Sequence, residues 1–145
     1  MLATPEAPIP PHELPHNIEA EHALLGALLI HNETLDRVSE IITAADFFDP
    51  LHARIWSAAA TMIAGDRRAD PVTLRPAFDG EPEMAPGLTV PGYLGRLVAN
   101  AVTTAGARDY ARTIHDLAMR RSIIRACYEA RMAAINFSPD QSPRT

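Results

Sequence analysis

The chain has 145 residues, 47% of them hydrophobic, and a formal net charge of −5, so it can form one domain with a hydrophobic core. All 13 basic residues are arginine, and the lack of lysine excludes a Walker A loop and lysine-based catalysis in this chain. The single Cys127 excludes an internal disulfide, and the apolar runs are too short to cross a membrane, so we expect a cytoplasmic protein.

The N-terminal third predicts an arm and two helices. Residues 1–16 contain five prolines and predict a disordered arm. Asn17 is a good N-cap for a helix through Ile30, with glutamates in its first turn, where the helix dipole favours negative charge. Apolar residues surround this helix nearly completely, so we expect it at the centre of the core. Asn32 is expected to cap a second helix that ends at Ile42.

The middle of the chain predicts three more short or medium helices. One runs from Pro50 to Ala64, before Gly65, and another starts at Asp70-Pro71. Residues 79–92 hold three glycines and three prolines and predict a loop, after which Tyr93 to Ala99 predicts a short helix. Because no stretch alternates as a strand would, we expect an all-α fold.

The last predicted helix is long and has two apolar stripes. Ala107 to Asn136 contains no proline or glycine and predicts a helix of roughly 45 Å. One stripe, interrupted by Arg121, consists of Tyr110, Ile114, Leu117, Ile124, Tyr128 and Ile135, and the other of Met119, Ile123, Ala126, Ala130, Ala134 and Phe137. One stripe can cover a small helical head, whereas the other requires another helix or another chain. Residues 138–145 are expected to form a linker or tail.

Charge is divided unevenly along the chain. Residues 107–136 carry six arginines and three acids, for a charge of +3, and the remainder carries 7 arginines and 15 acids, for −8. A mainly acidic body is unusual for a nucleic-acid binder, so we expect little or no direct DNA binding and a surface that selects partners by charge. Arg120, Arg121 and Arg125 therefore have three interpretations: a solvated face, pairing with acids of a neighbouring subunit or partner, or DNA contact.

Several segments, in this order, resemble the N-terminal domain of DnaB-type replicative DNA helicases. The first is Pro15-His16-Asn17-Ile18-Glu19-Ala20-Glu21 followed by Leu24-Leu25-Gly26. The others are Asp46-Phe47-Phe48, His52-Ala53-Arg54-Ile55-Trp56, Asp70-Pro71-Val72-Thr73-Leu74, Gly92-Tyr93-Leu94 and Tyr110-Ala111-Arg112-Thr113-Ile114. Together they cover about residues 14–137.

The resemblance implies a helical head over 17–105 and the first arm of an incomplete helical hairpin over 106–137. It further implies a non-catalytic domain that self-associates and binds a DnaG-type primase, and in some relatives a helicase loader. ATP and Mg²⁺ would belong to the separate ATPase domain of the parent helicase, so no cofactor is expected here. The primase-facing surface would map onto Glu19, Tyr93, Arg121 and Ile124, and we add Arg120, Arg125 and Tyr128 as interface candidates.

Residues that suggest chemistry also have structural explanations. Six histidines invite a metal or catalytic site, but we expect His52 to be a packed, hydrogen-bonded side chain and Asp46 and Asp49 to cap the helix after them. Trp56 and Cys127 are expected in the core, and Tyr93 as a half-buried ring or an interface residue. Two alternatives stay open: a stand-alone regulator or decoy that binds a helicase or primase, and a small helical enzyme.

Overall fold

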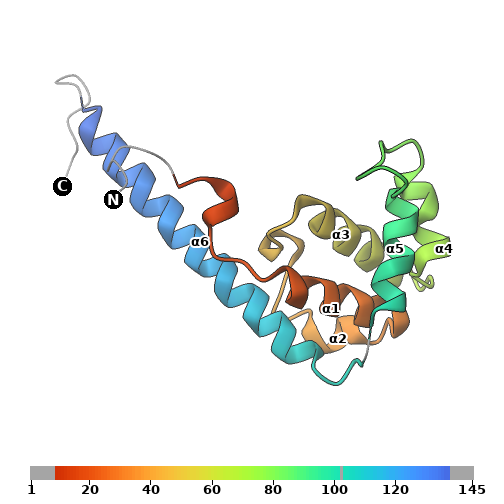
Figure 1. Cartoon of the computed structure of the whole chain (residues 1–145). Coiled ribbons are helices and arrows are strands. Elements are labelled where there is room, and N and C mark those ends of the chain that lie inside the picture. The colour runs from red at the N-terminus through yellow and green to blue at the C-terminus, as the bar shows by residue number, and fades with distance from the viewer. Residues whose placement is uncertain (1–8, 102, 138–145) are drawn as a thin grey trace.

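The computed structural model describes residues 9–101 and 103–137, in which helices form a head and one long helix leaves it (Figure 1). The head contains α1 (Ile18–Ile30), α2 (Thr34–Val38), α3 (Pro50–Ala64), α4 (Pro71–Leu74) and α5 (Val90–Ala99). Short 3-10 helices lie at Pro11–Glu13, Ala44–Asp46 and Arg75–Phe78. No strand occurs in these residues, so the predicted all-α class is confirmed.

Helix α1 is the centre of the head. The side chain of Asn17 accepts a hydrogen bond from the Ala20 amide at 3.0 Å, as expected of its N-cap. Leu24, Leu25 and Leu28 are completely buried, because α3, α5, α2 and α6 (Ala107–Ile135) all pack around this helix. The prediction that α1 is apolar on nearly every side because it is central is therefore confirmed.

Two predicted helix boundaries were wrong. Helix α2 ends at Val38 rather than Ile42, and Asn32 does not cap it. Instead, Asn32 donates to the carbonyls of Leu28 and Ala69 and accepts from the Ala69 amide, which ties the loop before α4 to the end of α1.

Helix α5 starts at Val90, three residues earlier than predicted. Thr89 caps it by accepting from the Gly92 amide at 3.1 Å, and Pro91 occupies the first turn, where a missing N–H costs nothing. The proline that indicated a loop therefore belongs to the helix start.

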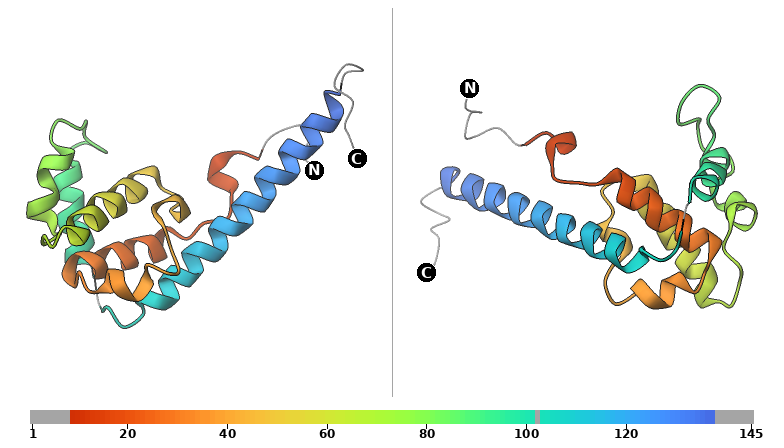
Figure 2. Two further views of the ribbon diagram at one scale, coloured as in Figure 1. Left: turned by 180° about the vertical axis from the view of Figure 1, so that it is seen from behind. Right: turned by 60° about the horizontal axis from the view of Figure 1, so that its bottom comes forward.

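Helix α6 extends beyond the head. Its N-terminal half packs through Ala107, Ala111, Ile114 and Ala118, all buried, and its C-terminal half continues past α1 to α5, as Figure 2 shows from two directions. The predicted length is confirmed. Cys127 lies in the projecting half and is exposed, so the expectation of a buried thiol was wrong.

The predicted arm and tail lie partly outside the described residues, which exclude 1–8 and 138–145. Within the predicted disordered arm, Pro11–Glu13 instead forms a 3-10 helix and Leu14 is buried. The division into a head over 17–105 and a hairpin helix over 106–137 stays a prediction. No helix among the described residues is long and apolar enough to cross a membrane.

Candidate functional site

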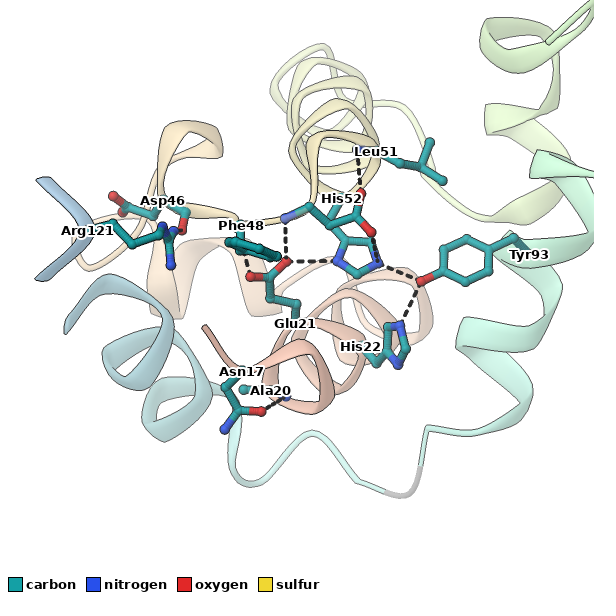
Figure 3. A network of polar contacts seen from close by, with 11 residues as sticks. Asn17, Ala20, Glu21, His22, Asp46, Phe48, Leu51, His52, Tyr93 and Arg121 are labelled. Atoms are coloured by element: carbon teal, nitrogen blue, oxygen red, sulfur yellow. Dashed lines mark hydrogen bonds and ion pairs between the residues drawn. The ribbon is translucent and has the colours of Figure 1, made fainter. Parts of the chain in front are cut away.

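The seven interface candidates fall into two separate places. Glu19 and Tyr93 line a pocket of about 380 Å³ between α1 and α5, together with His22, Leu88, Arg96 and Leu97. The other five candidates belong to α6. Figure 3 shows a polar network centred on Glu21 and His52, with Tyr93 on one side of it and Arg121 on the other. The sequence missed His22 and Arg96 as pocket residues, because only the packing of α1 against α5 brings them there.

Glu21 is the buried centre of this network. Its side chain accepts hydrogen bonds from the amides of Phe48 and Asp49, at 2.8 and 3.3 Å, and lies 2.8 Å from Nδ1 of His52. Only 1% of Glu21 is exposed, so these contacts replace the water that a carboxylate needs. They fix the start of α3 against α1. The sequence predicts Glu21 only as a first-turn acid and gives no sign of this role.

His52 and Tyr93 continue the network to the pocket. His52 is completely buried, as expected of a packed, hydrogen-bonded histidine, and its Nε2 lies 2.5 Å from the Tyr93 hydroxyl. The same hydroxyl lies 2.7 Å from Nε2 of His22, whose side chain is at the pocket rim. Tyr93 is therefore a half-buried ring whose polar atom is engaged inside the protein (Figure 3).

Burial shifts the pKa of two members of the network, Tyr93 and His22. It raises the pKa of Tyr93 to about 12, with further contributions from Asp49 and Glu21, so the hydroxyl keeps its proton at neutral pH. Burial, followed by the nearby His52, lowers the pKa of His22, against the opposite effects of Asp49, Glu21 and Glu19.

Arg121 holds α6 to the head and is not a solvated side chain. It donates to the carbonyls of Pro15 and Asp46, at 2.8 and 2.7 Å, and its guanidinium lies 5.4 Å from the centre of the Phe48 ring. Only 4% of the residue is exposed. The ring of His16 stacks on Phe48 at 4.0 Å, so the arm before α1 joins the same contact.

The neighbours of Arg121 on α6 differ from it. Arg120 pairs with Asp116 of the same helix at 2.9 Å, and Arg125 is exposed. Ile124 and Tyr128 are half-buried. These four remain on or near the surface, but none of them lies in the pocket of Glu19 and Tyr93.

The second apolar stripe of α6 is exposed along its whole described length. Met119 is 53% exposed, Ile123 60% and Phe137 48%, and the alanines between them are also exposed. Large apolar side chains in such a row are rare on a monomer surface and common at interfaces. The first stripe is buried only where it meets the head, and its last member, Ile135, is 52% exposed.

The residues that suggested chemistry have structural roles. Asp49 caps α3 by accepting from the Leu51 amide at 2.8 Å, and Asp46 accepts from the Thr43 amide and lies 3.2 Å from His115. Asp46 thus caps the 3-10 turn rather than the next helix. Trp56 is buried as predicted. In the described part of the chain, no three His, Cys, Asp or Glu side chains are arranged to hold a metal ion.

Comparison with known proteins decides the family. The model of the family described as DnaB-like helicase N terminal domain matches residues 13–116. The chain belongs to this family. Among curated relatives, the replicative DNA helicase DnaB of Rickettsia felis is 36% identical over 139 residues, which cover 95% of this chain. That of Rhodothermus marinus is 35% identical over 111 residues, which cover 75% of it.

The DnaB-type domain also has the fold of a solved relative. The crystal structure of the N-terminal domain of DnaB helicase from Mycobacterium tuberculosis matches with a TM-score of 0.76 and 23% identity, over 86% of this chain and 90% of that one. The chain spans 28% of the length of the Rickettsia felis helicase and 12% of the Rhodothermus marinus one. It is therefore the counterpart of one domain of these helicases.

Proposed function

We propose that this chain is a non-catalytic assembly and docking domain of a replicative DNA helicase. It associates with further copies of itself through α6 and binds a DnaG-type primase through the head. ATP and Mg²⁺ would be bound by the remaining part of such a helicase. The exposed stripe from Met119 to Phe137 is the observation that carries this proposal, since a helix that leaves its own domain with an apolar face uncovered needs a second helix.

The pocket between α1 and α5 supports the docking part of the proposal. Glu19 and Tyr93, which the family resemblance assigned to the primase-facing surface, share this pocket. In contrast, the hydrogen-bond donors of Arg121 already bind two carbonyls of the head. We therefore propose Glu19 and Tyr93 as docking residues and remove Arg121 from direct partner contact. A helicase loader is a further candidate partner.

Light scattering over a concentration series tests both parts. The chain alone is expected to form a dimer or larger assembly as its concentration rises, and the C-terminal domain of the cognate primase is expected to add its mass. A strictly monomeric chain contradicts assembly through α6. A mass unchanged by the primase domain contradicts docking.

The pocket has its own matched variants. Glu19→Arg reverses a charge on the pocket wall and is expected to weaken primase binding roughly tenfold. Glu33→Arg is the control, because Glu33 is an exposed acid outside that pocket. Equal primase affinity of the two variants would contradict docking at this pocket.

A further inference from the structure

A continuous polar chain runs from the rim of the pocket into the core. Its members are His22 at the rim, the Tyr93 hydroxyl, His52 and the buried Glu21, joined by contacts of 2.7, 2.5 and 2.8 Å (Figure 3). No role in assembly or docking accounts for it, since an apolar core would hold the helices together at less cost in desolvation.

Hydrogen-bond chemistry orders this chain from its buried end. The amides of Phe48 and Asp49 can only donate, so the Glu21 carboxylate accepts from both and also from Nδ1 of His52. A neutral His52 then has only a lone pair at Nε2 and accepts from the Tyr93 hydroxyl. The Tyr93 oxygen is left to accept from Nε2–H of His22.

One added proton can reside at either end of the chain. If His22 carries it, every hydrogen bond keeps its direction. If His52 carries it, Nε2 of His52 donates to Tyr93, and the Tyr93 hydroxyl donates to Nε2 of His22. The two forms interconvert when the proton on His22 Nε2 moves to the Tyr93 oxygen while the hydroxyl proton moves to His52 Nε2, so the positive charge passes between rim and core with nothing gained or lost.

We propose that His22, Tyr93 and His52 form a proton relay that couples charge in the α1–α5 pocket to the buried His52–Glu21 pair. The groups that face His22 are Glu19 and Glu21 from α1, Asp49 and His52 from the start of α3, and Tyr93 and Arg96 from α5. Glu21 and Asp49 draw the charge inward. An acidic group of a partner beside Nδ1 of His22 would draw the positive charge to His22 at the rim. Arg96 provides a second cation there for the same acidic partner.

The nitrogen resonances of the histidine rings test the relay in the chain alone. In the wild type, acidification through the titration of His22 is expected to shift the ring nitrogens of His52 at the same midpoint. Tyr93→Phe keeps the ring but breaks the relay, so its His52 signals are expected to lose that response. His115, which faces Asp46 away from the pocket, serves as the internal control, and its signals should be the same in both proteins.

Two results would overturn the relay. One is a His52 ring-nitrogen signal in the wild type that does not shift as His22 titrates. The other is a His52 signal in Tyr93→Phe that still shifts with the titration of His22. The backbone amide spectrum verifies that the variant is folded. This test needs no partner, so its outcome is independent of whether the chain binds primase.

The coupling of the relay to partner binding rests on the proposed docking function. Saturation with the primase C-terminal domain is expected to make His22 doubly protonated and to leave His52 neutral. Binding that changes neither histidine would contradict the coupling while supporting docking. An absence of binding would contradict docking alone, because the titration of the free chain still decides the relay.

Discussion

Glu19 and Glu21 lie two positions apart on α1, yet their surroundings differ completely. Glu19 is exposed beside the pocket, whereas Glu21 is buried and accepts two backbone amides. Removal of the Glu21 carboxylate leaves these two amides and Nδ1 of His52 without their partner, and a buried donor left unpaired costs about 1–3 kcal/mol.

We therefore expect Glu21→Ala to lower the free energy of unfolding by about 3 kcal/mol or more, because it strands several buried donors at once. Glu19→Ala is the matched control and is expected to cost about 0.5 kcal/mol, the size of an exposed helix-dipole interaction. Urea denaturation of both variants measures the difference. Similar losses would show that Glu21 does not anchor α3.

Adjacent arginines on α6 provide a second comparison. Arg121→Ala is expected to cost about 2–3 kcal/mol, since two partly buried carbonyls and the Phe48 ring lose their partner. Arg120→Ala should cost about 0.5 kcal/mol or less, because its pair with Asp116 is exposed. Thermal unfolding distinguishes the two, and a larger loss for Arg120 would refute the buried contact.

For single residues, the sequence predicted the roles of those whose partners lie a few positions away in the chain. Asn17, Asp49 and Asp70 cap helices as their positions indicated. The roles of Glu21 and Arg121 depend on Phe48 and Asp46, 27 and 75 positions away in the chain. Nothing in the sequence near Glu21 distinguishes it from a solvated charge, and the one local signal for Arg121 is its position within an apolar stripe.

The contact between α1 and α5 depends on a close approach of their backbones. A Cβ added at Gly26 would lie 2.6 Å from the Leu97 carbonyl oxygen and 2.9 Å from the Ala101 Cβ, and backbone atoms cannot move aside cheaply. At Gly95 on α5, a Cβ would meet nothing within 4 Å.

Gly26→Ala is accordingly expected to destabilise the domain by about 1–3 kcal/mol through overpacking. Gly95→Ala should instead stabilise it by about 0.5–1 kcal/mol, because alanine is the better helix former. The two melting temperatures should thus move in opposite directions. A stabilised Gly26→Ala variant would mean that α1 and α5 are not packed this closely.

A helix boundary could be predicted from the sequence where the residues that set it are close to it in the chain. Helices α1, α3 and α6 begin or end at signals within the sequence, and their predicted bounds agree with the structure to within about one residue. Helix α2 was misjudged because Asn32 bonds to Ala69, 37 positions away. Helix α5 was misjudged because Pro91 fits both a loop and a first helical turn.

For the molecule as a whole, the exposed face of α6 should govern self-association. Ile123→Glu places a charge on that face and is expected to shift the sedimentation coefficient to that of a monomer, with an association constant at least tenfold weaker. Ser122→Glu introduces the same charge on an adjacent exposed residue, about 100° around the helix, and should leave association unchanged. Equal effects of both variants would contradict an interface centred on this face.

The attachment of α6 has a mechanical consequence. Arg121 is the last fully buried side chain of α6, and the 14 residues from there to Ile135 extend the helix by roughly 21 Å. A tilt of the helix by about 10° at Arg121 would move its C-terminal end through roughly 4 Å, which is most of the pitch of one helical turn. A small rotation of α6 at the Arg121 contact therefore produces a large displacement of a partner bound at the C-terminal end of the helix.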